Sequence, residues 1–274
     1  MSKEGDAMTT QPQLRVLSLG WGVQSWTLAA MMALNELPRA DYLVHADTTW
    51  ERGATYEFAQ SWTPWLSEHG LDVVTVKSNR TEIIEEWQGR TNGVMIPAFT
   101  IGPNQTEGQL RRQCTNIWKV QPVRRFLSAE LGQRNIKKSP GVAAMLMGIS
   151  LDEFMRMKDS DVKYVQNEYP LVDLKMTRQD CIAWLERQNL PIPPKSACVF
   201  CPYHSKETWQ RMGRAGGPDF EVAARVDETV RNMRSKHTAF VHRSCRPLRE
   251  VVVDDGQLAM WPDDAECDSG YCFT

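Results

Sequence analysis

Residues 14–25 read LRVLSLGWGVQS, an apolar run followed by a turn that contains two glycines. Residues 14–19 have the composition of a short buried strand, and residues 25–34 (SWTLAAMMAL) have the spacing of a helix. Glycines between a strand and a helix let backbone N–H groups and the positive end of the helix dipole approach an anion. The stretch therefore predicts a phosphate-binding loop or, alternatively, a tight turn that needs glycine for its dihedral angles.

Strands and helices alternate beyond this loop. Further strands are expected at residues 41–46, 71–76 and 141–149, and helices at residues 55–69 and 121–131. The alternation predicts an α/β fold, a parallel sheet wrapped by helices. Residues 91–113 are rich in Gly, Pro, Asn and Gln and are expected to form a long loop.

Length and composition restrict the class of protein. The chain has 274 residues, a formal net charge of −2 and seven cysteines. Its length suits one large α/β domain, or one domain with a smaller lobe. A charge this close to zero gives no overall basic field, so contact with nucleic acid would depend on local patches.

The expected compartment is the cytoplasm, without membrane contact. No apolar run approaches the roughly 18 residues that span a bilayer, and the N-terminal residues lack the apolar core of a signal peptide. In that reducing compartment, cysteines are expected as metal ligands, reactive thiols or buried apolar side chains rather than as disulfides.

Four motifs in order carry a resemblance to a known family. They are SLGWGVQS at residues 18–25, HADTTWE at 45–51, CTNIWKVQP at 114–122 and KSACVFCP at 195–202. They resemble the S-G-G-x-x-S pyrophosphate loop (PP-loop) and the ADTGWE, CT…K…P and KSACxxCP segments of the phosphoadenosine phosphosulfate (PAPS) reductase-like branch of the adenine nucleotide α-hydrolase-like superfamily. That group includes ATP pyrophosphatases and the sulfur-transfer enzymes of tRNA thiolation and DNA phosphorothioation. The resemblance implies a Rossmann-like fold.

The resemblance also implies an adenine nucleotide, ATP or PAPS/APS, at the N-terminal loop. The residues expected to bind it there are Ser18, Gly20, Gly22, Gln24 and Ser25. Asp47 follows a strand at the edge where open α/β sheets bind ligands, and it would bind the ribose or Mg²⁺, or else cap a turn. Trp21 replaces the second glycine of the family's loop and would narrow the pocket or stack on the nucleotide. Lys119 would neutralise phosphate or lie on a solvated helix face.

The cysteines predict a metal centre. Cys198 and Cys201 are spaced to chelate one metal, and the pair alone fits zinc, a redox site or half of a larger site. In the family, the cysteine of the CT motif joins this pair and many members carry a 4Fe-4S cluster, so the resemblance adds Cys114. We expect Cys181 as the fourth ligand; the alternative is a small buried apolar residue in a helix. With three cysteines, one iron would stay open to sulfide or substrate.

Two further cysteines are candidates for a reactive thiol. Cys267 follows a glutamate, as in the mobile C-terminal ECGLH of sulfonucleotide reductases whose cysteine attacks sulfur, but DSG replaces the rest and Cys272 follows. Cys267 is the expected catalytic nucleophile, or else a tail cysteine without a role. Cys245 lies among basic residues that would lower a thiol pKa, and it is the weaker candidate.

The expected organisation has three parts. Residues 1–13 form a flexible lead, residues 14–150 a nucleotide-binding α/β domain, and residues 151–274 a smaller, mainly helical region that carries cysteines and completes the metal site. Ser150 and Thr177 each begin a stretch with capping-box chemistry, which predicts two helix N-termini in the third part.

Three functions fit these residues. In the first, ATP adenylates an oxygen of a DNA or RNA acceptor, pyrophosphate leaves, and a sulfur carried on a cysteine or the cluster displaces AMP; a sulfur donor such as a cysteine desulfurase would be a partner. The second is a PAPS or APS reductase with Cys267 as nucleophile. The third is a non-catalytic nucleotide-binding subunit. We favour the first because the tail matches the reductases only in part.

Overall fold

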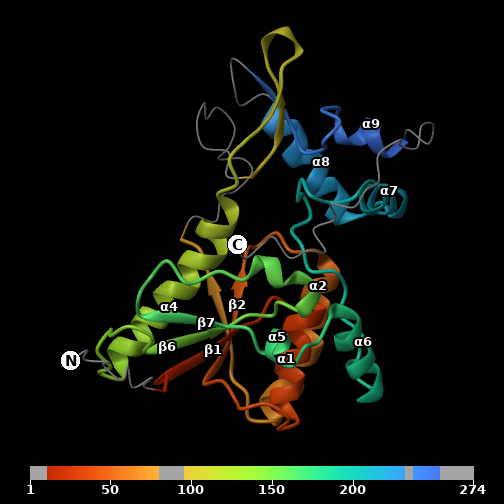
Figure 1. Cartoon of the computed structure of the whole chain (residues 1–274). Helices are drawn as coiled ribbons and strands as arrows, with labels where there is room; N and C mark the ends of the chain where they lie inside the picture. The colour runs from red at the N-terminus through yellow and green to blue at the C-terminus, as the bar shows by residue number, and fades with distance from the viewer. Residues whose placement is uncertain (1–10, 80–95, 232–236, 254–274) are drawn as a thin grey trace. The chain divides into compact units, whose positions relative to one another are not determined.

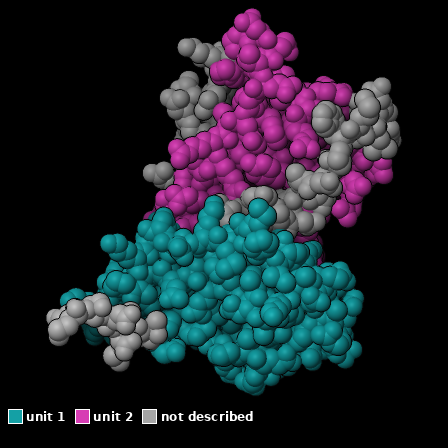
Figure 2. Space-filling view, viewed as in Figure 1, with its two compact units in different colours: residues 1–45, 61–75, 123–192 teal, residues 46–60, 76–122, 193–274 magenta. Residues whose placement is uncertain are grey.

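The computed structural model describes residues 11–79, 96–231 and 237–253 (Figure 1). The chain divides into two compact units, coloured separately in Figure 2. Unit 1 consists of residues 1–45, 61–75 and 123–192, and unit 2 of residues 46–60, 76–122 and 193–274. Residues 151–192 belong to unit 1, and the domain division expected at residue 150 stays a prediction. Most of the expected flexible lead, residues 1–10, lies outside the described part of the chain.

Unit 1 is organised around a five-stranded sheet in the order β3-β2-β1-β6-β7. The strands are β1 (Leu14–Ser18), β2 (Tyr42–Asp47), β3 (Val73–Lys77), β6 (Ala143–Leu146) and β7 (Val165–Glu168). β1 pairs in parallel with both β2 and β6, and β6 pairs in parallel with β7. The predicted α/β fold is confirmed, including four of its strands. The strand order reverses between β1 and β6, which is where open α/β sheets bind ligands.

Helices cover this sheet. They are α1 (Val23–Ala33), α2 (Gly53–Glu68), α4 (Gln121–Gln133), α5 (Pro170–Asp173) and α6 (Arg178–Arg187). Every residue of α1 is buried, and α1 packs on β1 and on α6. An apolar helix without a polar face needs cover on all sides, and α6 supplies part of it. This helix lies inside unit 1 because residues 25–34 are apolar nearly throughout.

The two predicted helix N-termini differ in the structure. Thr177 begins α6 with a complete capping box: its hydroxyl accepts from the Asp180 N–H, and the Asp180 carboxylate accepts from the Thr177 N–H. Ser150 makes no side-chain capping bond and precedes only a 3₁₀ turn, Leu151–Arg156. Its hydroxyl accepts from the Gln24 side chain instead, at 3.4 Å. The capping-box prediction was therefore right for Thr177 and wrong for Ser150.

Unit 2 combines a small antiparallel sheet with helices. The sheet has the order β5-β4-β8, and its strands are β4 (Phe99–Ile101), β5 (Glu107–Gln109) and β8 (Thr238–Phe240). The helices are α7 (Lys206–Ala215), α8 (Pro218–Arg231) and α9 (Leu248–Val253). The unit also contains a 3₁₀ turn (Pro103–Gln105) and a π-helical turn (Thr115–Val120). Trp118, Phe200 and Trp209 are central to its buried apolar core.

The predicted long loop over residues 91–113 was wrong where it is described, since β4 and β5 form a hairpin there (Figure 1). β4 also pairs with β8, more than a hundred residues further along the chain, so the strand depends on a partner that local composition does not reveal. The polar residues that suggested a loop occupy the hairpin tip, where Asn104 and Gln105 have positive φ. Within the described ranges, no helix is both long and apolar enough to cross a membrane.

Candidate functional site

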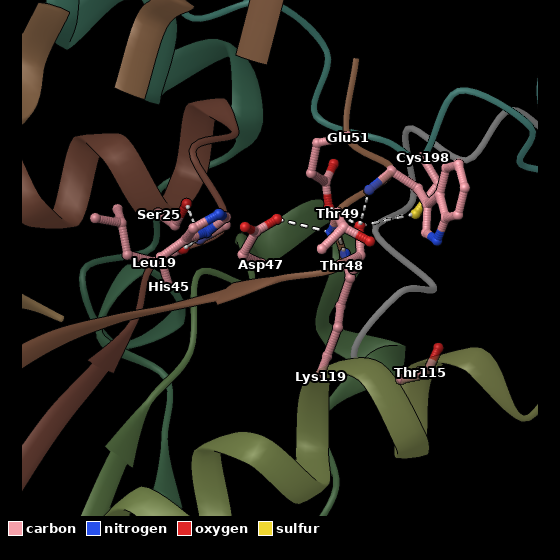
Figure 3. Close-up of polar contacts among 12 residues, drawn as sticks. Leu19, Ser25, His45, Asp47, Thr48, Thr49, Glu51, Thr115, Lys119 and Cys198 are labelled. Atoms are coloured by element: carbon pink, nitrogen blue, oxygen red, sulfur yellow. Dashed lines mark hydrogen bonds and ion pairs between the residues drawn. The ribbon is translucent and has the colours of Figure 1, made fainter. Parts of the chain in front are cut away.

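The phosphate loop, residues 18–25, lies between β1 and α1 in unit 1. The Ser25 hydroxyl accepts a hydrogen bond from the Gly20 N–H and donates one to the Gly22 carbonyl, both at 3.2 Å, which holds the turn closed. The N-cap residue of α1 is Gly22, which has no side chain to cap the first N–H groups of the helix. Uncapped N–H groups at the start of a helix are the groups that bind phosphate. The His45 imidazole donates from Nδ1 to the Leu19 carbonyl at 3.1 Å (Figure 3).

The backbone of Trp21 has a conformation that glycine adopts most easily. Its φ is 56°, in the left-handed region that glycine adopts at little cost. Its side chain is 1% exposed and stacks on Trp26, with ring centroids 6.1 Å apart. Trp26 in turn contacts Trp62 and Trp65. The indole of Trp21 therefore belongs to an aromatic cluster inside unit 1, which corrects the expectation that it narrows the pocket or stacks on a nucleotide.

Gly148 is a loop-supporting residue that sequence reasoning missed. It follows β6, on the other side of the point where the strand order reverses. A Cβ added at Gly148 would lie 2.7 Å from the Ser25 nitrogen and 3.0 Å from its Cα, closer than real side chains approach. The backbone after β6 thus packs directly on the phosphate loop. The only sequence signal was a glycine at the end of an apolar strand, which is common in any α/β fold.

Gln24 links the phosphate loop to the turn after β6. Its side-chain amide donates to the Ser150 hydroxyl at 3.4 Å and to the Glu153 carboxylate at 3.3 Å. Glu153 is also paired with Arg156 at 2.6 Å, and both side chains are buried. Burial raises the pKa of Glu153, and the charge of Arg156 acts in the opposite direction. Arg156 is thus a buried cation that is paired with a residue in contact with the loop, and no sequence motif singled it out.

Asp47 is held by three donors within unit 2. Its Oδ1 accepts from the Thr49 N–H and from the Tyr56 hydroxyl, both at 2.7 Å, and its Oδ2 lies 3.0 Å from Lys77 Nζ. Burial acts to raise the pKa of Asp47, but the hydrogen bonds from Tyr56, Lys77 and Thr49 outweigh it and leave the pKa lowered. The bond to the N–H two residues ahead is an Asx turn. This geometry supports the turn-cap alternative; a bond to ribose or Mg²⁺ stays a prediction.

Three of the predicted metal ligands line one pocket of unit 2. This cysteine pocket encloses about 460 Å³, including the solvent at its mouth. Its lining residues are Cys114, Cys198, Cys201, Thr48, Ile96, Pro97, Arg112, Thr115, Trp118, Lys119, Phe200, Pro202 and Tyr203. Cys114, although far from the C-x-x-C pair along the chain, thus lines the same cavity as that pair. A shared role of the three cysteines as metal ligands stays a prediction.

The π-helical turn Thr115–Val120 explains how one short segment supplies four lining residues. In such a turn the hydrogen bonds run from residue i to i+5, and π-helical turns are frequent at functional sites. Residues four or five apart then lie nearly above one another, so Cys114 and Thr115 share a face with Trp118 and Lys119.

His204 fixes the C-x-x-C turn. The Cys201 N–H donates to the Cys198 carbonyl at 3.0 Å, and His204 Nε2 lies 2.9 Å from the same carbonyl, to which it donates. Burial lowers the pKa of His204 to about 4, so the ring is neutral at physiological pH. The ring packs edge-on against Trp209 at 4.8 Å. Sequence reasoning missed His204 because its role depends on backbone contacts.

A buried ion pair lies beside the thiols (Figure 3). Lys119 Nζ is 3.4 Å from Glu51 Oε1, and the two side chains are 9% and 2% exposed. The Thr48 hydroxyl donates to the same carboxylate oxygen and lies 3.4 Å from Cys198 Sγ. Lys119 therefore lies in the cysteine pocket rather than on a solvated helix face. Its positive charge suits a pocket that holds thiolates or an anion.

The remaining cysteines lie elsewhere. Cys181 is in unit 1, on α6, fully buried, and burial raises the pKa of its thiol to about 12. These are the surroundings of a small apolar residue, the alternative to a ligand role. Cys245 is buried, and burial raises the pKa of its thiol, opposite to the lowering expected from its basic neighbours. Cys267 and Cys272 lie outside the described residues.

The donor set suits a metal cluster, although the thiols are not gathered around an ion. None of the five cysteines in the described ranges forms a disulfide. Over the same ranges, no three His, Cys, Asp or Glu side chains form a group that could hold a metal ion. Three thiols in a mostly apolar pocket are nevertheless the ligand type that iron–sulfur clusters require.

No protein-family model and no curated protein matches this sequence. Among solved structures, the chain is similar to a phosphoadenylyl-sulfate (PAPS) reductase from Candida auris, with a TM-score of 0.44, 16% sequence identity and coverage of 68% of this chain and 78% of that one. It is also similar to the U34-tRNA thiolase NcsA from Methanococcus maripaludis with its 4Fe-4S cluster, with a TM-score of 0.34, 12% identity and coverage of 91% and 83%. At these TM-scores, the sequence motifs and the geometry of the two units remain the basis for any functional assignment.

Proposed function

We propose that this protein is an adenine-nucleotide-dependent sulfur-transfer enzyme that activates a nucleic-acid acceptor. The observation that carries the proposal is that Cys114, Cys198 and Cys201 line one pocket, which Lys119 also lines. A phosphate loop at the reversal point of the sheet in unit 1 supplies the second requirement, a place for ATP.

The reaction would have three steps. An oxygen of the acceptor attacks the α-phosphorus of ATP, the bond to the β-phosphate breaks, and pyrophosphate leaves. A sulfur atom from a donor, such as the persulfide of a cysteine desulfurase, then attacks the activated centre and AMP leaves with the oxygen. A reducing thiol then attacks the donor's sulfur in the S–S bond that joins donor and acceptor, so that the transferred sulfur stays on the acceptor and the thiol and the donor form a disulfide. The N–H groups of the phosphate loop and the N-terminus of α1 would stabilise the negative charge that develops on the departing pyrophosphate.

Cys114, Cys198 and Cys201 would hold a 4Fe-4S cluster in the cysteine pocket. Such a cluster would supply a Lewis-acidic iron that binds sulfur, and the buried Lys119–Glu51 ion pair would lie beside it. Cys181 as the fourth ligand stays a prediction, as does a role for Cys267 as a catalytic nucleophile.

Pyrophosphate release from ATP, measured with anaerobically purified protein, tests the function. We expect release that depends on added single-stranded RNA or DNA. Sulfite formed from PAPS or APS in a Cys267-dependent reaction would instead establish the reductase alternative. Nucleotide binding without either product would establish the non-catalytic alternative.

A further inference from the structure

The mouth of the cysteine pocket carries an aromatic ring beside a cation. Tyr203 follows the C-x-x-C turn directly and is partly exposed. The Arg112 guanidinium lies 6.0 Å from the centre of its ring, at the outer limit of a cation–π contact. Both residues line the same pocket as the three thiols. Arg112 therefore adds positive charge at the ring without close stacking on it.

Neighbouring residues hold this pair in place. Arg112 Nε donates to the Thr115 hydroxyl at 2.9 Å, which anchors the guanidinium to the π-helical turn. The Gln109 side chain donates to the Pro97 carbonyl at 3.0 Å and reaches the Tyr203 hydroxyl at 3.5 Å. Gln109 thus holds the hydroxyl end of the ring and Thr115 holds the guanidinium, and an ordered ring loses little entropy when it binds a ligand.

The chemistry of this mouth matches one unpaired nucleotide. An aromatic ring stacks on any nucleobase, and arginine meets both the base plane and the phosphate. Arg111, exposed and next in sequence to Arg112, adds a second positive charge.

We propose that Tyr203 and Arg112 bind one unstacked nucleotide of a single-stranded nucleic acid at the mouth of the cysteine pocket, with the base on the Tyr203 ring and a phosphate at Arg111 and Arg112. The assignment rests on the proposed function and names the residues that present the acceptor to the thiols. It also accounts for a local basic site on a chain whose net charge is close to zero.

The test is the affinity of the anaerobically purified full-length protein for short fluorescent single-stranded RNA and DNA, measured by anisotropy without ATP. Tyr203→Ala is expected to weaken binding about 5- to 100-fold, whereas Tyr203→Phe keeps the ring and should bind within about twofold of wild type. Tyr164→Ala is the matched control: Tyr164 also lies under a cation, Lys138 at 5.2 Å, but in unit 1. Its affinity should equal that of wild type.

Each outcome decides the proposal. Unchanged binding by Tyr203→Ala, equal loss in Tyr203→Phe, or no binding of either strand type by wild type would overturn it. The RNA and DNA arms identify the sugar of the ligand. Binding is measured without ATP, so it can be judged separately from the reaction. If binding depends on Tyr203 but the acceptor causes no pyrophosphate release, the binding site is supported and sulfur transfer is rejected. The reverse pattern would reject the site and retain the enzyme.

Discussion

Replacing Glu51 with alanine is expected to lower the free energy of unfolding by about 3–5 kcal/mol, the range for breaking a buried ion pair on one side. The Lys119 and Glu51 side chains are 9% and 2% exposed, and their charged atoms are 3.4 Å apart. Alanine removes the carboxylate and leaves the ammonium buried beside the thiols. Urea denaturation of the full chain, with unchanged slope, measures the loss.

Two control variants separate burial from charge. Glu221 pairs with Arg249 in the same unit, but these side chains are 55% and 46% exposed, so Glu221→Ala should change stability little. The double variant Glu51→Leu/Lys119→Met removes both charges and should recover most of the loss. A Glu51→Ala variant no less stable than Glu221→Ala would contradict a buried pair beside the cysteine pocket.

Replacing Gly148 with alanine is expected to weaken ATP binding by about 5- to 150-fold. The added Cβ would lie 2.7 Å from the Ser25 nitrogen, so the phosphate loop or the turn after β6 must move. Overpacking of this kind costs about 1–3 kcal/mol. If the strain is relieved by moving the loop away from its nucleotide-binding conformation, ATP binding must restore that conformation, and the same free energy corresponds to that change in dissociation constant. Isothermal titration calorimetry with ATP measures it.

Gly132→Ala is the matched control for this variant. Gly132 also lies in unit 1, within α4, and an added Cβ there meets nothing within 4 Å. Alanine at this helical position should bind ATP as wild type does and should stabilise the helix slightly. Equal affinities for the two variants would show that the backbone after β6 does not support the phosphate loop.

Local sequence signals were sufficient for the sheet and for the glycine turn between β1 and α1. An apolar run, a glycine turn and helix-forming residues define β1, the loop and α1 without reference to the rest of the chain. Thr177 and Asp180 similarly define the start of α6, because a capping box is complete within four residues. Such features are readable because all their partners are neighbours in sequence.

Features that depend on distant partners were missed. β4 pairs with the distant strand β8. The Ser150 hydroxyl accepts a hydrogen bond from the Gln24 side chain rather than from the N–H groups at the start of a helix. Trp21 points into the aromatic cluster because its backbone has a positive φ, which residue type alone disfavours. His204 was not singled out because its partner is a backbone carbonyl.

The cysteines show both cases. The resemblance grouped Cys114 with Cys198 and Cys201, and the structure places all three on one pocket. The resemblance did not say where Cys181 lies. Its buried position in α6 follows from the apolar spacing of that helix.

The iron content of the anaerobically purified protein tests the central claim most directly. We predict about four iron atoms per chain with acid-labile sulfide in wild type, and loss of both in Cys114→Ala and Cys198→Ala. Cys245→Ala, a buried thiol outside the cysteine pocket, should retain them. If Cys181→Ala keeps its iron, three cysteines are enough to hold the cluster. If Cys181→Ala loses its iron, this supports Cys181 as the fourth ligand. Zinc as the only metal, or full iron retention in Cys114→Ala, would contradict a cluster held by this pocket.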